Sequence, residues 1–141
     1  MIFSLDTNII AGIWSGTSEG RADRLSLQTM QKSGQELMVC GVVYAELAAY
    51  PGMDRGAVDA FLKATAITLD LQMPEAAWQA AADAHHAYQL RRRRSGGGTA
   101  KRVLPDFLIG AHALHRAAAL MTRNPGDFKD FPALVLVEPT S

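Results

Sequence analysis

Short runs of strand character alternate along the chain with longer segments of helical periodicity, and this alternation restricts the fold more than any other feature. The runs are residues 2–5, 37–40, 66–71, 118–121 and 134–137. Each has the length of a buried strand. Strands that alternate with helices are joined by right-handed crossovers and form a parallel sheet covered on both faces. The sequence therefore predicts an α/β layered fold.

Helices are expected in the segments between these runs. Residues 18–33 show helical spacing with a charged outer face, and Gly34 ends this helix. Further helices are expected over residues 42–48, 55–63 and 74–94, and a last one opens at Asp106. The glycine-rich residues 95–99 are expected to be mobile.

The size and composition of the chain are those of one ordinary domain. Its 141 residues can bury a stable core without disulfides or structural metals, and we assign residues 1–141 to a single domain. Lys plus Arg and Asp plus Glu both number 14, so any attraction to nucleic acid must come from local patches. Cys40 cannot form an internal disulfide, and no apolar run approaches the ~18 residues of a membrane span. We expect a soluble cytoplasmic protein without membrane association.

Acidic residues stand at the ends of several of these elements. Asp6 follows the first strand, and Glu46 lies in the first turns of the helix after the second strand. Asp106 stands in the first turn of the last helix, and Asp127 lies in the polar turn after the fourth strand. In open α/β sheets, ligands bind outside the carboxyl ends of the strands. If the first and fourth strands are neighbours, their terminal carboxylates meet.

This arrangement of acids indicates a divalent metal ion. Neighbouring carboxylates repel one another and stay ionised together only beside a cation. Oxygen ligands without a His/Cys set at zinc spacing point to Mg²⁺, with Mn²⁺ as a substitute. Phosphodiester hydrolysis makes the best use of such a site, because the metal activates a water and offsets charge on the reacting oxygens. The residues favour a metal-dependent nuclease.

Four motifs in this order resemble those of PIN-domain ribonucleases, specifically the VapC-type toxins of bacterial toxin–antitoxin pairs. They are Asp6-Thr7-Asn8, the helix Val-Val-Tyr-Ala-Glu-Leu from residue 42, Pro-Asp-Phe-Leu-Ile-Gly-Ala-His-Ala from residue 105, and Thr-Arg-Asn-Pro-Gly-Asp-Phe from residue 122. The resemblance covers nearly the whole chain. It implies a PIN-like fold with a central five-stranded parallel sheet flanked by helices on both faces.

The same resemblance implies an activity and partners. The activity is that of a Mg²⁺-dependent endoribonuclease that cleaves RNA and so inhibits translation. The partners are an RNA substrate, a second copy of the chain in a homodimer, and a VapB-like antitoxin whose tail fills the active-site groove, with higher hetero-oligomers formed with that antitoxin.

By position, the resemblance assigns Asp6, Glu46 and Asp106 as the first three acids, which bind the metal and carry catalysis. Many members of the family have the fourth acid at the place of Asn124. Here Asp127, one helical turn further on, is the available acid. Whether Asn124 or Asp127 fills this place stays open at this point, as does the number of metal ions.

Polar groups beside these acids are expected to support them. Thr122 matches a hydroxyl at the end of the fourth strand that holds the cluster through hydrogen bonds. Thr7, Asn8 and Asn124 belong to the same motifs and are assigned the same supporting role.

Each acid also has a simpler structural explanation when it is taken alone. Asp6 and Asp106 suit a helix N-cap and a first turn, and Asp127 suits a turn. Glu46 is harder to explain in this way, because its neighbours are apolar and no basic residue lies one helical turn away. A buried carboxylate in such surroundings needs a partner. The set of four favours a site.

Six of the 14 basic residues gather within residues 91–102, directly before the last helix; they are Arg91, Arg92, Arg93, Arg94, Lys101 and Arg102. A solvated helix end is the ordinary explanation of such a run. Because this run leads into Asp106, we predict that it binds RNA phosphates beside the site and becomes ordered on binding RNA or antitoxin.

The histidines and Trp14 are assigned structural roles. His112 and His115, and the adjacent pair His85 and His86, lack Cys or His partners at zinc spacing. We expect these four on polar faces or in packing contacts. Trp14 is expected in the core or in a dimer interface, with base stacking near the groove as the alternative.

Two other classes of function stay open. A Mg²⁺-dependent phosphoacceptor signalling domain would also be α/β with acids at strand ends, and Asp70 could act as its acceptor. Such a domain needs a Lys after its last strand, however, and this chain has only Glu138 there. The other alternative is a catalytically inactive PIN-fold binding module whose acidic groove holds an arginine-bearing partner.

Overall fold

The computed structural model describes residues 1–96 and 103–139, and its centre is a sheet of five parallel strands. The strands are β1 (Ile2–Leu5), β2 (Glu36–Cys40), β3 (Thr68–Asp70), β4 (Ala119–Met121) and β5 (Leu136–Val137), in the order β3-β2-β1-β4-β5. The chain builds one half of the sheet outward from β1 and then returns to build the other half. The first and fourth strands are neighbours, which is the condition under which their terminal carboxylates were expected to meet.

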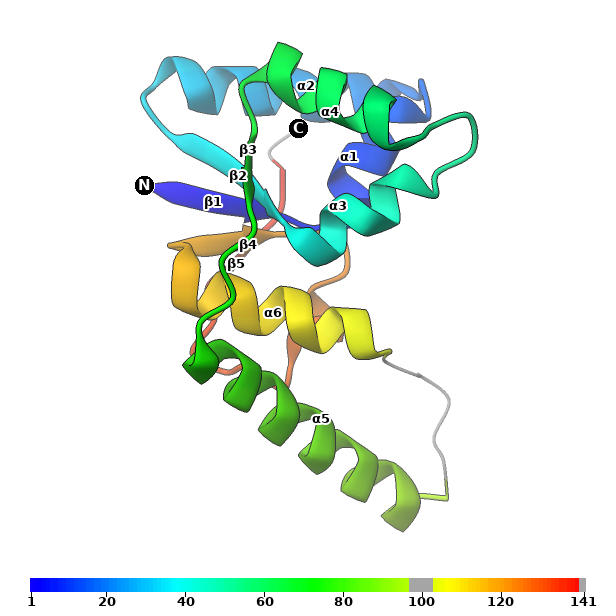
Figure 1. Cartoon of the computed structure of the whole chain (residues 1–141), viewed down its shortest axis with the longest axis vertical. Coiled ribbons are helices and arrows are strands. Elements are labelled where there is room, and N and C mark those ends of the chain that lie inside the picture. The colour runs from blue at the N-terminus through cyan, green and yellow to red at the C-terminus, as the bar shows by residue number, and fades with distance from the viewer. Residues whose placement is uncertain (97–102, 140–141) are drawn as a thin grey trace.

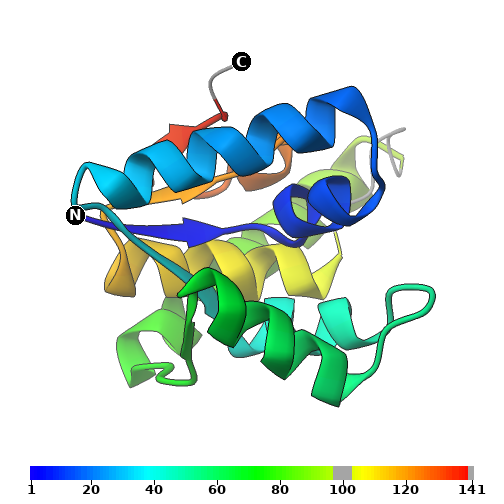
Figure 2. The same cartoon turned by 90° about the horizontal axis from the view of Figure 1, so that it is seen from above.

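Helices cover both faces of this sheet (Figure 1). They are α1 (Thr7–Trp14), α2 (Ser18–Lys32), α3 (Gly41–Ala48), α4 (Arg55–Thr65), α5 (Glu75–Arg94) and α6 (Leu104–Arg116), with a short 3₁₀ helix, η1 (Pro125–Phe128), after β4. Figure 2 shows α2 on one side of the strands and α6 on the other. The five-stranded parallel α/β architecture predicted from the sequence is confirmed.

Helix α1 was not predicted. Its sequence, TNIIAGIW, has apolar residues on every side after the first turn, so it lacks the polar face that reveals helical periodicity. The helix starts directly at Thr7 because the side chain of Asp6 caps it, and Ile9 and Ile10 are fully buried. The end of the first strand is therefore also the start of a helix.

The predicted outer face of α2 was wrong in its details. Asp23 is only 2% exposed, whereas Leu25 is 64% exposed. The inward stripe of this helix is Gly20, Asp23 and Leu27. An acid replaces an apolar residue in this stripe, and hydrophobic periodicity alone cannot recognise such a substitution.

The core fills both sides of the sheet. Leu5, Val39 and Leu120 are fully buried strand residues, and Phe107 of α6 is almost fully buried. Trp14 packs edge-on against Tyr50 and Phe61, with ring centroids 5.3 and 5.1 Å away. The predicted packing role of Trp14 agrees with these contacts.

No helix in the described part of the chain is long and apolar enough to cross a membrane. Of the residues predicted to be mobile, Ser95 and Gly96 close the end of α5, and residues 97–99 lie outside those that the structure describes.

Candidate active site

Asp6 lies at the point where the strand order reverses, and its carboxylate is held on both oxygens. Oδ1 accepts a hydrogen bond from the backbone N–H of Thr7 at 2.8 Å, which makes Asp6 the N-cap of α1. Oδ2 accepts from the hydroxyl of Thr122 at 2.8 Å and from Nδ2 of Asn8 at 3.2 Å. The side chain is nearly buried, with 7% of the residue exposed. Its position and orientation are therefore set by residues from both halves of the sheet.

Thr122 directly follows β4 and brings its hydroxyl to the site. The residue is fully buried, and its backbone N–H donates to the carbonyl of Val137 at 3.0 Å, which extends the β4–β5 ladder by one bond. Its hydroxyl oxygen accepts from the backbone N–H of Asn124 at 3.0 Å while the hydroxyl donates to Asp6. The structure thus brings Asp6, Asn8 and Thr122 together, as expected from adjacent strand ends.

The pKa of Asp6 is raised to about 6, and burial is the largest cause. The hydrogen bonds from Thr122 and from the Thr7 backbone lower this pKa in part, and the negative charges of Asp106 and Glu46 raise it further. Three carboxylates from β1, α3 and α6 are thus near enough to interact. A cation bound nearby would lower the pKa of Asp6 again by favouring the ionised carboxylate.

Glu46 reaches the site from α3, but the expectation that it is buried was wrong. Val43 and Leu47 face the core from the same helix, whereas Glu46 is exposed. Its Oε1 accepts a hydrogen bond of 2.6 Å from the hydroxyl of Thr7. The apolar residues around Glu46 in the sequence lie on other faces of the helix, and Thr7 is the partner that it meets.

Asp106 stands in the first turn of α6, where its Oδ2 accepts from the backbone N–H of Val103 at 3.3 Å. Asp127 lies on η1 and is half-buried, and its backbone N–H donates to the carbonyl of Asn124 at 3.0 Å. The carboxylates that raise the pKa of Asp6 are those of Asp106 and Glu46. Asn124 and Asp127 both follow β4. Their positions do not decide which of them takes the place of the fourth acid.

The acids fit a hard cation in their chemistry. They offer carboxylate oxygens, the ligands that Mg²⁺ prefers, and the mutual repulsion that raises the pKa of Asp6 is what a cation would relieve. Within residues 1–96 and 103–139, however, no three side chains of Asp, Glu, His or Cys converge closely enough to be recognised as a metal-binding group. The charges of Asp106 and Glu46 nevertheless act on Asp6, so these three carboxylates lie near one another.

The arginine run ends α5, away from the sheet (Figure 1). Arg91 pairs with Asp130, and the guanidinium of Arg92 lies 5.9 Å from the ring centroid of Tyr88. Arg93 and Arg94 are exposed. Lys101 and Arg102 lie outside the described residues.

His112 and Asp70 form a polar contact on the other half of the sheet. Nε2 of His112 lies 3.1 Å from Oδ2 of Asp70, and Nε of Arg116 donates to the same oxygen at 2.9 Å. Burial lowers the pKa of His112, and the hydrogen bond from Arg116 lowers the pKa of Asp70. His85 stacks near Phe107, with ring centroids 4.9 Å apart. These contacts fit the packing roles expected of the histidines.

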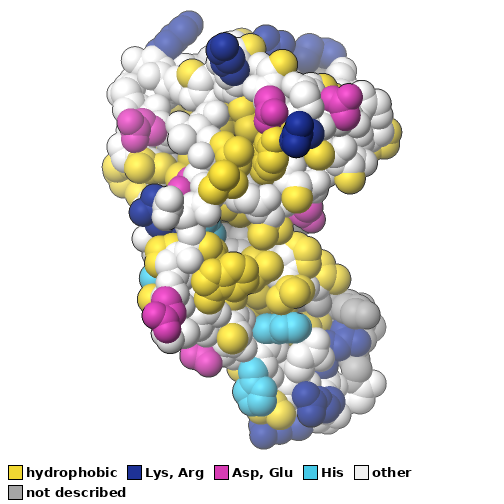
Figure 3. Space-filling model, in the orientation of Figure 1, with side chains coloured by type: hydrophobic (Ala, Val, Ile, Leu, Met, Phe, Trp, Pro, Cys, Tyr) yellow, Lys and Arg dark blue, Asp and Glu magenta, His cyan; other side chains and the backbone are white. Residues whose placement is uncertain are grey.

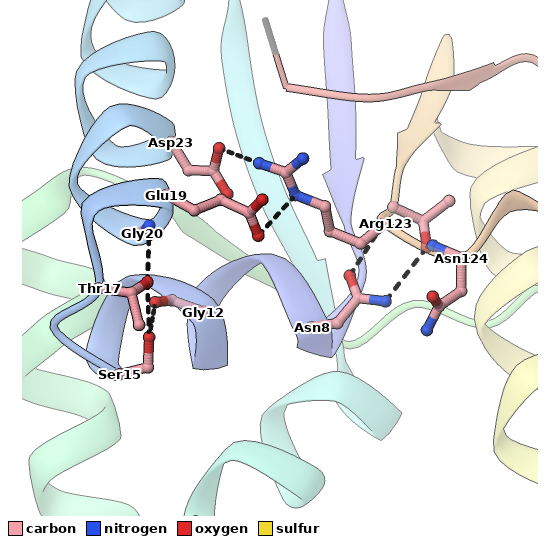
Figure 4. Close-up of polar contacts among 10 residues, drawn as sticks. Asn8, Gly12, Ser15, Thr17, Glu19, Gly20, Asp23, Arg123 and Asn124 are labelled. Carbon is pink, nitrogen blue, oxygen red and sulfur yellow. Dashed lines mark hydrogen bonds and ion pairs between the residues drawn. The ribbon is translucent and has the colours of Figure 1, made fainter. Parts of the chain in front are cut away.

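Sequence reasoning missed two residues beside the site, Arg123 and Asp23. Figure 4 shows the guanidinium of Arg123 reaching from the end of β4 to Asp23 on α2. The backbone N–H of Arg123 donates to Oδ1 of Asn8 at 3.2 Å. The one clue in the sequence was an acid three residues after Gly20 and four before Leu27, which places it on the stripe that proved to be buried.

A five-stranded parallel sheet with buried and half-buried acids at its switch point defines a class of α/β protein, and comparison with known proteins identifies the family within it. The model of the PIN domain family matches residues 4–134. The chain therefore belongs to the PIN domain family. This confirms the family resemblance seen in the sequence. None of the curated proteins compared matches the sequence significantly.

Solved structures share the fold over almost the whole chain. A chain of VapBC2 from Rickettsia felis, bound to a DNA fragment from its promoter, is 22% identical with a TM-score of 0.66 and 98% of each chain covered. A chain of VapBC-1 from nontypeable Haemophilus influenzae is 20% identical with a TM-score of 0.67 and full coverage of both chains. A chain of a toxin–antitoxin complex from Klebsiella pneumoniae is 22% identical with a TM-score of 0.60 and 98% of each chain covered. At these identities the likeness shows a common fold.

Proposed function

We propose that this protein is a metal-dependent endoribonuclease, the VapC-like toxin of a toxin–antitoxin pair, and that it inhibits translation by cleaving RNA. PIN domains are generally nucleases. The observation that carries the proposal is the state of Asp6, a nearly buried carboxylate held by hydrogen bonds on both oxygens while the charges of Asp106 and Glu46 act on it. An acid kept in this state at a strand end suits a metal-dependent site.

In this proposal Asp6, Glu46 and Asp106 hold Mg²⁺, or Mn²⁺ in its place, with Asp127 as the fourth acid. The bound metal would lower the pKa of a water and offset charge on the phosphate oxygens. Neighbouring residues orient two of these acids for metal binding. Thr122, Asn8 and the Thr7 backbone fix the rotamer of Asp6, and the Thr7 hydroxyl on α1 orients Glu46 on α3.

The proposed partners follow from the structural neighbours, which are chains of VapBC and other toxin–antitoxin complexes. We infer a VapB-like antitoxin that covers the site, and a homodimer that assembles into larger complexes with it. The side chains of Leu71, Trp78 and Leu104 support an interface, because each is at least 50% exposed. Leu71 and Trp78 line a cavity of about 210 Å³ together with Leu108. Figure 3 shows hydrophobic side chains gathered over the middle of the molecule.

The test is cleavage of total cellular RNA by the purified protein. We expect discrete fragments with Mg²⁺, none with EDTA, and none with Asp6→Asn. Asp83→Asn, which changes an exposed acid on α5, is the matched control and should cleave like the native protein. Cleavage by Asp6→Asn at the native rate would trace the activity to a contaminant and refute the nuclease assignment.

The phosphoacceptor alternative is disfavoured by the geometry, and the binding-module alternative is decided by the RNA assay. Asp70 ends the edge strand β3, where Arg116 and His112 occupy its oxygens, so it is poorly placed to accept a phosphoryl group. A binding module without catalysis would predict that Mg²⁺ raises the melting temperature of the native protein while RNA stays intact. The RNA assay therefore separates this alternative from the proposed function.

A further inference from the structure

The segment after β4 is held by contacts on two sides. One contact is beside the acidic cluster of Asp6, Glu46 and Asp106, and the other is with α2, outside that cluster. Toward the cluster, the backbone N–H of Arg123 donates to Oδ1 of Asn8 at 3.2 Å. Away from it, the guanidinium of Arg123 pairs with the carboxylate of Asp23 on α2 (Figure 4). One residue thus links the second helix to the polar side chain that contacts Asp6.

The contact between Arg123 and Asp23 is an ion pair that fixes the two side chains relative to each other. Asp23 is only 2% exposed, and a carboxylate so buried requires a charged partner. Arg123 provides it, and the hydrogen bond to Asp23 raises the pKa of the guanidinium. A second acid, Glu19, lies 3.9 Å from Nε of Arg123 but is largely exposed. The guanidinium therefore faces α2 and is neutralised there, which leaves it poorly placed to bind a phosphate.

Helix α2 is in turn fixed against α1. A Cβ added to Gly20 would lie 2.2 Å from the carbonyl oxygen of Gly12, so the two backbones touch at this crossing. The hydroxyl of Thr17 caps α2 by accepting from the backbone N–H of Gly20 at 3.0 Å. Asp23 lies about one turn further along α2, and Asn8 lies in the first turn of α1. The crossing sets the position of Asp23 relative to Asn8.

The orientation of the Asn8 amide is what this arrangement controls. Because the backbone N–H of Arg123 donates to Oδ1, the Nδ2 group is directed to Oδ2 of Asp6 at 3.2 Å and to the Thr122 hydroxyl at 3.4 Å. A flipped amide would place its oxygen against the carboxylate of Asp6 and leave the Arg123 N–H without its acceptor.

We propose that Arg123 and Asp23 are positioning residues for the active site: their ion pair holds the Thr122–Asn124 segment so that Asn8 presents its amide donor to Asp6. Neither residue touches the reacting atoms. The inference deepens the proposed function and rests on it for its catalytic meaning, but the positioning itself can be measured without RNA.

The experiment compares the full chain with Arg123→Gln, Asp23→Asn and the double variant, with Glu19→Gln as the matched control. The first readout is the affinity of the metal-free protein for Mn²⁺ alone, measured by calorimetry. The second is kcat and KM on an RNA oligonucleotide. Partners that orient metal ligands typically contribute about 10- to 100-fold to metal affinity or activity. We expect Mn²⁺ affinity and kcat to fall by this range in both single variants, with KM unchanged.

Two further expectations distinguish an ion pair from two separate effects. The double variant should be no worse than either single variant, because the second change removes a partner that is already lost. Arg123→Lys keeps the charge and should restore part of the Mn²⁺ affinity, and Glu19→Gln should keep all of it. If Arg123→Gln does not fold, Asp23→Asn carries the same test with an isosteric change.

Three results would overturn the inference. A raised KM with native Mn²⁺ affinity would make Arg123 an RNA contact. A lowered melting temperature with native Mn²⁺ affinity and kcat would make the pair purely structural. Effects that multiply in the double variant would exclude a shared role. If the native chain does not cleave RNA while its Mn²⁺ affinity still depends on Arg123 and Asp23, the proposed function fails and the positioning role stands.

Discussion

Single residues of this site serve the fold and the chemistry together. Asp6 caps α1 through Oδ1, while Oδ2 accepts hydrogen bonds from Thr122 and Asn8 and so ties the same carboxylate to the end of β4. Asp106 likewise accepts the Val103 N–H in the first turn of α6 while its charge acts on Asp6. A capping role for an acid is therefore no argument against a functional one.

The raised pKa of Asp6 predicts a pH-dependent loss of stability in the metal-free protein. Its folded-state pKa is about 6 against an ordinary value of 3.8, so the folded state binds more protons between these values. Stability then falls as pH rises from about 4 to about 6, by roughly 2–3 kcal/mol in total. Urea unfolding in EDTA across this pH range measures the change.

Asp6→Asn should lack this pH-dependent part, and Asp83→Asn should keep it. Mg²⁺ should restore stability to the native protein above pH 6, because a cation favours the ionised carboxylate. Parallel pH curves for the native protein and Asp6→Asn would show that another group is responsible.

Thr122→Val tests the hydrogen bond that orients Asp6. The change keeps the shape of a fully buried side chain but removes the donor to Oδ2 and the acceptor for the Asn124 N–H. A hydrogen bond to a charged group contributes about 1.5–3 kcal/mol, and we expect a loss of this size in the free energy of unfolding at pH 8. Thr122→Ser keeps the hydroxyl and should lose clearly less. Equal losses would attribute the effect to packing.

At the scale of elements, the sequence predicted the strands well where a short apolar run is bounded by polar residues or glycine. The strands at Ile2–Leu5 and Glu36–Cys40 were predicted to within one residue. The rules of parallel sheets allowed the first strand to lie beside the fourth, and β1 does pair with β4 on one side and with β2 on the other. Helix α1 was hidden because its sequence has no polar stripe. Asp23 could not be assigned because its partner Arg123 is 100 residues away and only the fold brings them together.

The crossing of α1 and α2 gives a prediction with an internal control. Gly20→Ala would place a methyl group 2.2 Å from the Gly12 carbonyl oxygen, so the helices must separate. Overpacking of this kind costs about 1–3 kcal/mol. Gly12→Ala, the reciprocal change, meets no atom within 4 Å and should be neutral or stabilising by up to about 1 kcal/mol. Thermal or urea unfolding measures both, and equal destabilisation would refute the close crossing.

At the scale of the whole molecule, acidic and basic residues are equal in number but unevenly distributed. The net charge is zero, yet four consecutive arginines end α5. Arg91 and Arg92 already have partners in Asp130 and Tyr88, which makes Arg93 and Arg94 the better candidates for RNA phosphates. The composition could not reveal this run of positive charge at the end of α5.

Arg93→Gln combined with Arg94→Gln should reduce the salt dependence of RNA binding. Each lost contact with a single-stranded phosphate lowers the slope of log K against log salt by about 0.7. Binding is measured in EDTA to prevent cleavage. Arg55→Gln with Lys63→Gln removes the same charge from exposed positions on α4 and should leave the slope unchanged. An unaltered slope in the α5 variant would make the run a solvated helix end.

Trp78→Ser tests the proposed dimer. Trp78 is 53% exposed and lines the cavity with Leu71, so an interface on this face should depend on it. Light scattering at micromolar concentration should show a dimer for the native chain and a monomer for Trp78→Ser. Leu25→Ser changes a comparably exposed apolar residue on α2 and should remain dimeric. A native chain that elutes as a monomer would contradict the dimer.

The separation of Asp6 and Thr122 by 116 positions also matters while the protein is being made. During synthesis the first strand emerges with its acid, but β4 is the next-to-last strand of the chain. A nascent chain that has not yet released residues 119–122 has neither the strand that lies beside β1 nor the hydroxyl that orients Asp6. For a protein proposed to attack RNA, this order of assembly delays the competent site until residues 119–122 have been released from the ribosome.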